Sequence, residues 1–153
     1  MGSTSVPPSK NPISSLPSEF ISQQGIITKE SIINYKLIAF YFSAHWCPPC
    51  RAFTPKLAEF YKKVNDKEKI LQIIFVSSDN DLTSFNNYFS TMPWIAIPFA
   101  NKKREEIMNI FGIYGIPCLI VCDNLGNIVD SNGRNSVNSE GIKVVANWLK
   151  NNI

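Results

Sequence analysis

The stretch "FSAHWCPPCRAFTP", residues 42–55, decides how this sequence is interpreted. It places Cys47 and Cys50 on either side of a proline pair, directly after an aromatic residue. This spacing is compatible with three kinds of chemistry: a metal-binding knuckle, a structural disulfide, or two thiols that cycle between reduced and oxidised forms. The sequence on either side of the pair separates these alternatives.

The segments that flank the cysteines predict a buried strand that leads into a helix. "KLIAFYFSA", residues 36–44, is a nearly continuous apolar run of strand length, typical of a central strand covered on both faces. After Pro48 and Pro49 the apolar side chains recur at three- and four-residue spacing, which places them on one face of a helix starting at the prolines. Cys47 is therefore expected at the strand-to-helix junction, and Cys50 one turn into the helix.

The rest of the chain predicts an α/β domain. We expect a second buried strand at 70–78, a helix capped by Asn80 or Asp81, an extended segment at 92–99, a helix up to Gly112, a hairpin within 117–133, and a last helix at about 139–150. The inner face of the last helix is expected to carry Ile142, Val145, Ala146 and Leu149. Helical connections favour parallel strands and the hairpin an antiparallel pair, so the fold class is a central mixed sheet flanked by helices.

The composition of the 153-residue chain fits one globular domain. With 44% hydrophobic residues, the chain is long enough to bury one substantial core and short for two. Residues 1–18 are rich in Ser and Pro, so we expect a mobile arm there and a packed domain over 19–153.

Charge and hydropathy exclude two classes of partner. The net charge is +3, and the one dense charged run, "NKKREE" at 101–106, mixes both signs like a solvated helix start, so no nucleic acid partner is expected. No segment approaches the roughly 18 to 20 apolar residues of a membrane span, and no secretory signal is visible. We therefore expect no membrane contact and a reducing compartment, the cytoplasm.

The position of Cys47 predicts an activated thiol. A thiol in the first turn of a helix meets the positive end of the helix dipole and unpaired N–H groups, which lower its pKa. Because Pro48 and Pro49 lack amide hydrogens, the amide of Cys50 is the expected donor to the Cys47 sulfur. We expect Cys47 to be the exposed nucleophile, and Cys50 to be the buried thiol that resolves the mixed disulfide.

Two nearby side chains are candidates for supporting roles. Asp79 stands at the end of the neighbouring predicted strand, where it could shuttle protons or, equally, cap a turn. His45 is the one histidine of the chain, and we expect it to be a solvent-exposed loop residue.

The remaining cysteines, Cys118 and Cys122, raise the question of a metal site. Structural zinc requires four ligands at about 2.3 Å from one ion. In an extended strand, residues four apart are separated by about 13 Å, so these two sulfurs cannot both reach one ion or pair with each other. We expect no metal and interpret Cys122 as a small core residue. Pro117 precedes Cys118, and local sequence leaves open whether its peptide bond is cis or trans.

Three segments together resemble the tryparedoxin and nucleoredoxin branch of the thioredoxin superfamily. They are "YFSAHWCPPCRAFTPKLAEFY" at 41–61, "MPWIAIPF" at 92–99 and "FGIYGIPCLIV" at 111–121, in the family's order and spacing. The resemblance implies a thioredoxin fold, with Cys47 as nucleophile and Cys50 as resolving thiol. It also implies that Pro117 is a cis-proline facing the cysteines. The residues that it implies in substrate binding are Trp46 on the exposed rim, Pro48, Pro49, Pro117 and the backbone of Ile116.

Three positions differ from the pattern of tryparedoxins or of thioredoxin itself. Cys118 replaces a small hydroxyl-bearing residue, which would put a third thiol beside the active pair and allow a side disulfide. Ser78 stands where tryparedoxins have a tryptophan, so the rim of the site loses an aromatic side chain. Tyr41 stands where thioredoxin itself has a buried acid, which removes that proton shuttle and agrees with tryparedoxin.

The resemblance implies a thiol–disulfide oxidoreductase that reduces protein disulfides, such as those of peroxiredoxins, and that needs no cofactor. Its electron donor would be a low-molecular-weight dithiol (trypanothione or glutathione) or a reductase, and we expect a monomer. An alternative from another class is a redox sensor or adaptor of the same fold, which binds partners without multiple turnover.

Overall fold

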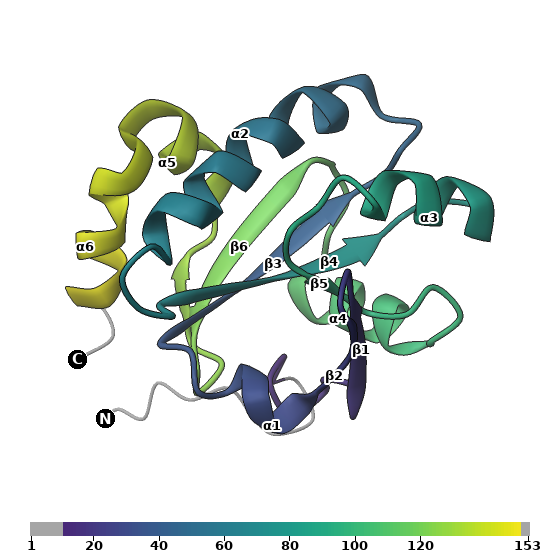
Figure 1. The fold of residues 1–153 in the computed structure, drawn as a ribbon, viewed down its shortest axis with the longest axis horizontal. Coiled ribbons are helices and arrows are strands. Elements are labelled where there is room, and N and C mark those ends of the chain that lie inside the picture. Colours follow the sequence, from purple (N-terminus) through teal and green to yellow (C-terminus); the bar gives the residue numbers. More distant parts are fainter. Residues whose placement is uncertain (1–10, 151–153) are drawn as a thin grey trace.

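The computed structural model describes residues 11–150 of the chain (Figure 1). Its seven strands form a single sheet in the order β2-β1-β5-β4-β3-β6-β7. The strands are β1 (Glu19–Ser22), β2 (Gly25–Thr28), β3 (Leu37–Ser43), β4 (Leu71–Ser77), β5 (Ile95–Ala96), β6 (Cys118–Asp123) and β7 (Ile128–Asp130). The helices are α1 (Lys29–Ile32), α2 (Pro48–Val64), α3 (Leu82–Phe89), α4 (Lys103–Phe111), α5 (Gly133–Glu140) and α6 (Val144–Lys150), with a 3₁₀ turn at Gly141–Lys143.

The centre of the sheet confirms the predicted mixed topology. β3 runs parallel to β4 and antiparallel to β6, and β6 continues into the hairpin with β7. Every residue of β3 and β4 is buried, which explains why both segments are continuous apolar runs rather than alternating ones. The thioredoxin fold expected from the sequence is therefore present.

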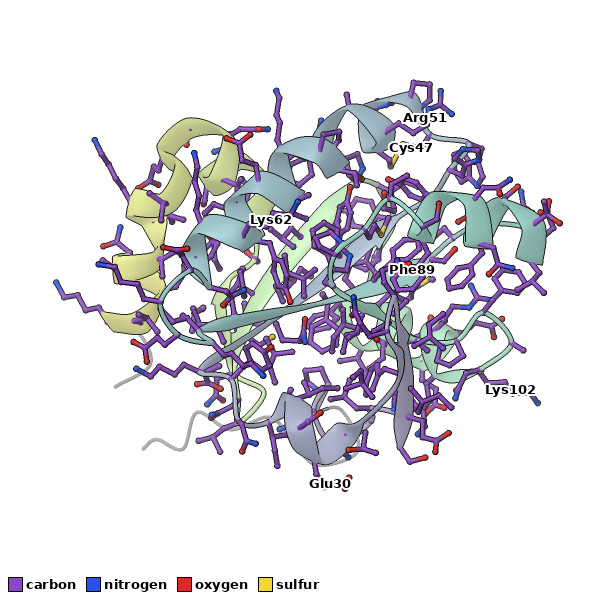
Figure 2. The ribbon with its side chains drawn as sticks, in the orientation of Figure 1. Glu30, Cys47, Arg51, Lys62, Phe89 and Lys102 are labelled. Carbon is purple, nitrogen blue, oxygen red and sulfur yellow. A yellow bond between two sulfur atoms is a disulfide. The ribbon has the colours of Figure 1, made fainter. Side chains whose placement is uncertain are left out.

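Helices cover both faces of the sheet and divide the core into two layers (Figures 1 and 2). The first layer packs α2, α3 and α6 against one face and contains Tyr41, Phe75 and both cysteines of the CPPC motif. The second layer packs α1 and α4 against the other face and contains Phe40 and Phe42. Because successive residues of a strand point to opposite faces, the neighbours Tyr41 and Phe42 belong to different layers.

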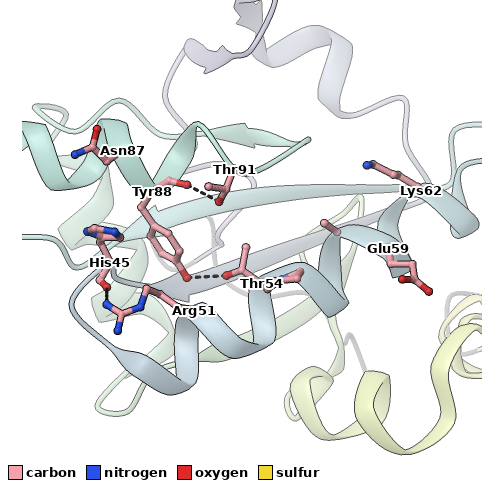
Figure 3. Close-up of a pocket in the computed structure, with 10 residues that line it drawn as sticks. His45, Arg51, Thr54, Glu59, Lys62, Asn87, Tyr88 and Thr91 are labelled. Atoms are coloured by element: carbon pink, nitrogen blue, oxygen red, sulfur yellow. Dashed lines mark hydrogen bonds between the residues drawn. The ribbon is translucent and has the colours of Figure 1, made fainter.

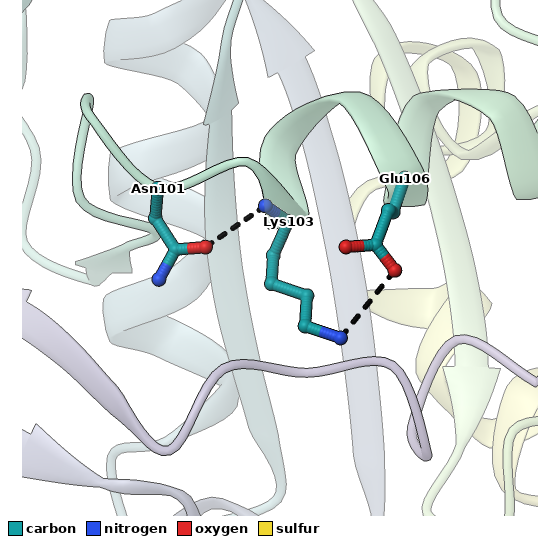
Figure 4. Close-up of polar contacts among 3 residues, drawn as sticks. All are labelled: Asn101, Lys103 and Glu106. Carbon is teal, nitrogen blue, oxygen red and sulfur yellow. Dashed lines mark hydrogen bonds and ion pairs between the residues drawn. The ribbon is translucent and has the colours of Figure 1, made fainter.

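The charged run at 101–106, predicted to be a solvated helix start, is only partly solvated: Lys102, Glu105 and Glu106 are exposed, and Lys103 and Arg104 are half-buried. The side chain of Asn101 accepts a hydrogen bond from the Lys103 amide at 2.8 Å, and Lys103 pairs with Glu106 at 3.4 Å on the exposed surface (Figure 4). The helix ends at Gly112, whose left-handed φ of 63° closes the last turn. Arg104 donates to the Phe99 and Ser77 carbonyls, so this side chain attaches the start of α4 to the domain.

The prediction for the C-terminal helix was wrong in its start and in part of its inner face. The helical region begins at Gly133, and the turn at Gly141 separates α5 from α6. This break resets the helical phase, so α6 buries Val144, Val145 and Trp148. Of the four residues predicted to face inward, Val145 is buried, Leu149 is half-buried, and Ile142 and Ala146 are exposed.

The predicted N-terminal arm falls partly outside the described residues, because the structure describes the chain from residue 11 onward. Residues 11–18 pack against the domain: Leu16 is 4% exposed in the second core layer, and Asn11 donates a hydrogen bond to the Leu125 carbonyl at 2.9 Å. Packing therefore starts before Glu19, and the mobility predicted for the arm stays a prediction for residues 1–10. Within residues 11–150 no helix is long and apolar enough to cross a membrane.

Candidate active site

The dithiol lies at the end of the central strand, where β3 leads into α2. Cys47 is the N-cap residue of α2, and its sulfur accepts a hydrogen bond from the Cys50 amide at 3.3 Å. The first two helical positions are the prolines, so this amide is the first one available to the sulfur, as predicted. Cys47 and Cys50 form a disulfide with their Cα atoms 5.2 Å apart (Figure 2).

The two cysteines of the pair differ slightly in exposure. Cys50 is fully buried, whereas Cys47 keeps 5% of its surface exposed. The expectation of an exposed Cys47 was therefore wrong for the disulfide form, because the Ile116 carbonyl lies 4.0 Å from its sulfur and covers it from the opposite loop. Trp46, by contrast, is 55% exposed on the rim, as predicted, and its indole N–H donates to the Ser78 carbonyl at 3.2 Å.

Asp79 fixes the loop that precedes the dithiol. One carboxylate oxygen accepts the His45 amide at 2.7 Å, and the other accepts the Ser77 hydroxyl at 2.8 Å. The Asp79 amide in turn donates to the Ser77 hydroxyl oxygen at 2.9 Å. The carboxylate is 5% exposed and both of its oxygens are engaged, which matches the turn-capping alternative of the sequence analysis. Its role as a proton shuttle stays a prediction.

A cluster of buried hydroxyl groups lies beneath Cys50. Thr54 donates to the Cys50 carbonyl at 3.0 Å, and its oxygen lies 2.7 Å from the Tyr41 hydroxyl and 2.6 Å from the Tyr88 hydroxyl. Because Thr54 has a single hydroxyl proton, it accepts from both tyrosines, and Tyr88 is then left to accept from Ser43 at 2.6 Å. Burial raises the pKa of Tyr41 far above its ordinary value, so the Tyr41 hydroxyl stays neutral.

The sequence analysis missed this hydroxyl cluster. Its members are far apart in the sequence, since Ser43 and Tyr88 are separated by 45 residues and Thr54 and Tyr88 by 34. One local signal was available: Thr54 falls on the apolar face of α2, one turn after Cys50, where a polar side chain needs a buried partner.

The opposite side of the site is the loop from Gly112 to Pro117. The Ile116–Pro117 peptide bond is cis, as the resemblance implied, and the Ile116 carbonyl faces the Cys47 sulfur. Tyr114 is fully exposed at the tip of this loop. The loop thus brings backbone, rather than charged side chains, to the dithiol.

The two remaining cysteines lie away from the dithiol. Cys118 packs against the second core layer, opposite the face that holds Cys47 and Cys50, because β6 alternates its side chains and gives Leu119 to the first layer. The prediction that Cys118 places a third thiol beside the active pair is therefore wrong. Burial raises the pKa of the Cys118 thiol, and the pKa of the deeply buried Cys122 thiol is also raised. Within residues 11–150 no group of three or more His, Cys, Asp or Glu side chains is placed to hold a metal.

Comparison with known proteins places this site in a family. The family model described as Thioredoxin-like matches residues 34–128. The chain belongs to the thioredoxin-like family. It is 45% identical over 106 residues to probable nucleoredoxin 1 of Arabidopsis thaliana, covering 69% of this chain and 18% of that protein.

Solved tryparedoxins share the fold of this thioredoxin-like domain. Tryparedoxin from Trypanosoma brucei superimposes with a TM-score of 0.79 at 35% identity, covering 88% of this chain and 94% of that chain. Tryparedoxin II complexed with glutathionylspermidine gives a TM-score of 0.76 at 32% identity, covering 84% and 90%. The domain thus has the fold of the thioredoxin-like family and carries its cysteine pair at disulfide distance. The chain spans about a fifth of the length of the nucleoredoxin relative.

Proposed function

We propose that this protein reduces disulfides of protein substrates, with Cys47 as nucleophile and Cys50 as resolving thiol. One observation carries the proposal: the Cys47 sulfur caps α2 and accepts the Cys50 amide, while Cys50 is fully buried behind it. An N–H donor and the positive helix end stabilise a thiolate at Cys47, whereas complete burial favours the neutral thiol at Cys50.

The electron balance of the cycle follows from thiolate exchange. The Cys47 thiolate attacks one sulfur of the acceptor disulfide, forms a mixed disulfide and expels the other acceptor sulfur as a thiolate. Cys50 loses its proton and attacks the Cys47 sulfur, which closes the Cys47–Cys50 disulfide and releases the second acceptor thiolate. Two electrons pass to the acceptor, and both acceptor thiolates take up protons. A donor dithiol reverses the exchange and restores the two thiols.

The surface around the dithiol supports binding of an extended substrate segment. Trp46, Pro48 and Pro49 are exposed on one side of the sulfurs, and Ile116 and Pro117 lie on the other. Aromatic and proline side chains offer rigid apolar contact, and the outer edge of a loop backbone can pair with an extended chain. We assign these five residues to substrate binding.

The proposed donor rests on one of the comparisons, and the proposed acceptors rest on the family resemblance of the sequence. The tryparedoxin II structure holds glutathionylspermidine, which supports a low-molecular-weight dithiol or glutathione-type donor, trypanothione among them, with a dedicated reductase as the alternative donor. Peroxiredoxin-type proteins are the proposed acceptors, and a cytoplasmic monomer carrying electrons between the two is the proposed setting.

Matched serine variants test the assignment of the two cysteines. With dithiothreitol as donor and insulin as acceptor, Cys47→Ser should abolish turnover, because no nucleophile remains to attack the acceptor. Cys50→Ser should also lose efficient turnover. In a separate reaction with insulin and without dithiothreitol, it should accumulate a mixed disulfide between Cys47 and insulin, visible as an added mass that later addition of dithiothreitol removes. Cys122→Ser, which alters only a buried thiol outside the dithiol, is the control for thiol loss.

Two results would count against the proposal. A mixed disulfide trapped by Cys47→Ser and not by Cys50→Ser would reverse the roles of the two cysteines. One round of oxidation without sustained insulin reduction by the unaltered chain would favour the sensor or adaptor alternative.

A further inference from the structure

A pocket of about 530 Å³ opens between α2 and α3 (Figure 3). Arg51, Pro55, Ala58 and Lys62 line it from α2, and Tyr88 lines it from α3. Neither active-site cysteine lines the pocket, and neither does the Ile116–Pro117 loop. A volume of this size lies within the range of small-ligand sites in proteins.

The floor of the pocket is apolar in character although it contains hydroxyl groups. Thr54 and Tyr88 are both buried there, and their hydroxyls hydrogen-bond each other at 2.6 Å. These hydroxyls are committed to the cluster beneath Cys50, so the floor presents mainly the ring of Tyr88 and the methyl of Thr54. Together with Pro55 and Ala58 they form a surface suited to an apolar or aromatic body.

The rim of the pocket carries an excess of positive charge. Glu59 is its one carboxylate, and it pairs with Lys63 at 3.1 Å. Arg51 donates to the neutral His45 carbonyl at 2.6 Å, which leaves its charge uncompensated. Lys62 has no carboxylate within ion-pair distance among residues 11–150. Arg51 and Lys62 thus lie at opposite ends of the apolar floor, about 16 Å apart along α2, and each lacks an anionic partner among residues 11–150 (Figure 3).

From this arrangement we propose that the pocket binds an amphipathic organic anion, a carboxylate carried on an aromatic or apolar body. The body occupies the space between Pro55, Ala58 and the Tyr88 ring, and the carboxylate meets Lys62, one turn beyond Ala58 on α2. The same chemistry is available from a free small acid or from an acidic, aromatic segment of a protein. The site is distinct from the surface that meets the substrate disulfide.

Binding is measured by amide chemical shifts in the ¹⁵N-labelled full chain in its disulfide form. The probes are 4-phenylbutyrate and its neutral counterpart, 4-phenylbutan-1-ol. The acid should shift the amides of Ala58, Lys62 and Asn87, and it should bind about threefold more tightly than the alcohol because it also meets Lys62. Equal affinity for acid and alcohol, no binding of the acid, or shifts centred on residues 114–118 would overturn the proposal.

A pair of lysine variants on one helix separates a local contact from a general effect of charge. Lys62→Gln should weaken binding of the acid about threefold and leave binding of the alcohol unchanged. Lys56→Gln removes the same charge from α2, but Lys56 lines a different groove, so binding should stay near that of the unaltered chain. An equal loss in both variants would contradict the proposed contact.

A short peptide distinguishes the two sources of the ligand. The blocked tripeptide acetyl-Glu-Phe-Glu-amide is titrated under the same conditions as the acid. Shifts of the same amides by the peptide would assign the pocket to a protein segment, and shifts by 4-phenylbutyrate alone would assign it to a free small acid. These experiments measure binding, whereas insulin turnover tests the thiol chemistry alone. The proposed pocket and the proposed function can therefore fail independently.

Discussion

The two sides of the dithiol are built in different ways. The framework side, defined by Ser43, Thr54, Asp79 and Tyr88, consists of buried side chains whose polar atoms hydrogen-bond one another or the loop before Cys47. The loop side, residues 112–117, is a backbone segment with Tyr114 fully exposed at its tip. No backbone amide of residues 114–116 donates a hydrogen bond to another residue within the described part of the chain.

This difference assigns separate tasks to the two sides. Buried, mutually satisfied polar groups hold a fixed geometry, because any movement leaves a donor or acceptor unpaired. A loop with exposed side chains can instead vary its contacts from partner to partner at little cost to the fold. Framework variants should therefore change stability and thiol geometry, and loop variants should change the choice of acceptor.

The largest effect is expected at Asp79. Asp79→Asn replaces an acceptor of two hydrogen bonds with an amide that can accept only one of them well, so the free energy of unfolding should fall by about 2–3 kcal/mol. Urea unfolding of the oxidised protein measures the loss, with the exposed Asp66→Asn as control. Unchanged stability together with a large fall in insulin turnover would show that the proton-shuttle role, rather than the framework role, is correct.

Thr54 should give the next largest effect. Thr54→Val keeps the shape of the side chain but removes the hydroxyl that accepts hydrogen bonds from Tyr41 and Tyr88. The free energy of unfolding should therefore fall by about 1–2 kcal/mol. The rate of Cys47 alkylation at pH 7 should also change, because the Cys50 carbonyl loses its Thr54 donor and the first helical turn is free to shift. Thr83→Val, at an exposed position of α3, is the control and should be neutral. A neutral Thr54→Val would contradict the positioning role of the cluster.

Tyr114 should affect partner choice without affecting stability. Tyr114→Ala removes a side chain that makes no buried contact, so unfolding should change by less than about 0.5 kcal/mol. If the ring is a contact for folded acceptors, kcat/KM with a peroxiredoxin should fall about three- to tenfold. Reduction of a small aromatic disulfide such as 5,5′-dithiobis(2-nitrobenzoate) should not change. Equal losses with both acceptors would place Tyr114 in the chemistry instead.

The smallest effect is expected at Cys118. Burial raises its pKa, so at pH 7.5 it carries less thiolate than an exposed cysteine, and its alkylation by iodoacetamide should still be accelerating above pH 9. Mass spectrometry of the reduced protein should find Cys47 modified well before Cys118. Mild oxidation should give the Cys47–Cys50 disulfide alone, and a Cys47–Cys118 disulfide would contradict the assignment of Cys118 to the opposite face of the sheet.

Much of the framework could be predicted because its signals are local. A continuous apolar run fixed the expectation for β3, and the two prolines singled out the Cys50 amide as the donor to Cys47. The features that were not predicted correctly depend on how segments distant in the sequence are aligned in the fold. The face of the sheet on which the Cys118 side chain lies depends on the register of β6. A shift of that register by one residue would move the side chain to the other face.

The C-terminal helix and the hydroxyl cluster illustrate the same limit. The turn at Gly141 resets the phase of α6, and a periodic pattern alone does not reveal such a break. Tyr88 contacts Ser43 and Thr54 because the tertiary fold brings α3 next to β3 and α2. The pairing is therefore a product of tertiary structure.

The hydrogen bond from Asn11 to Leu125 has a consequence for how the domain can be labelled. Leu125 lies in the turn after Asp123, which pairs with Leu37 at the start of β3, whereas the dithiol follows the other end of that strand. The two ends of β3 are roughly 20 Å apart. A side chain on Gly126 would collide with Asn11, so this attachment is close-fitting. A label attached at Ser14 would therefore sit at the end of the domain opposite the thiols and leave them open to incoming proteins.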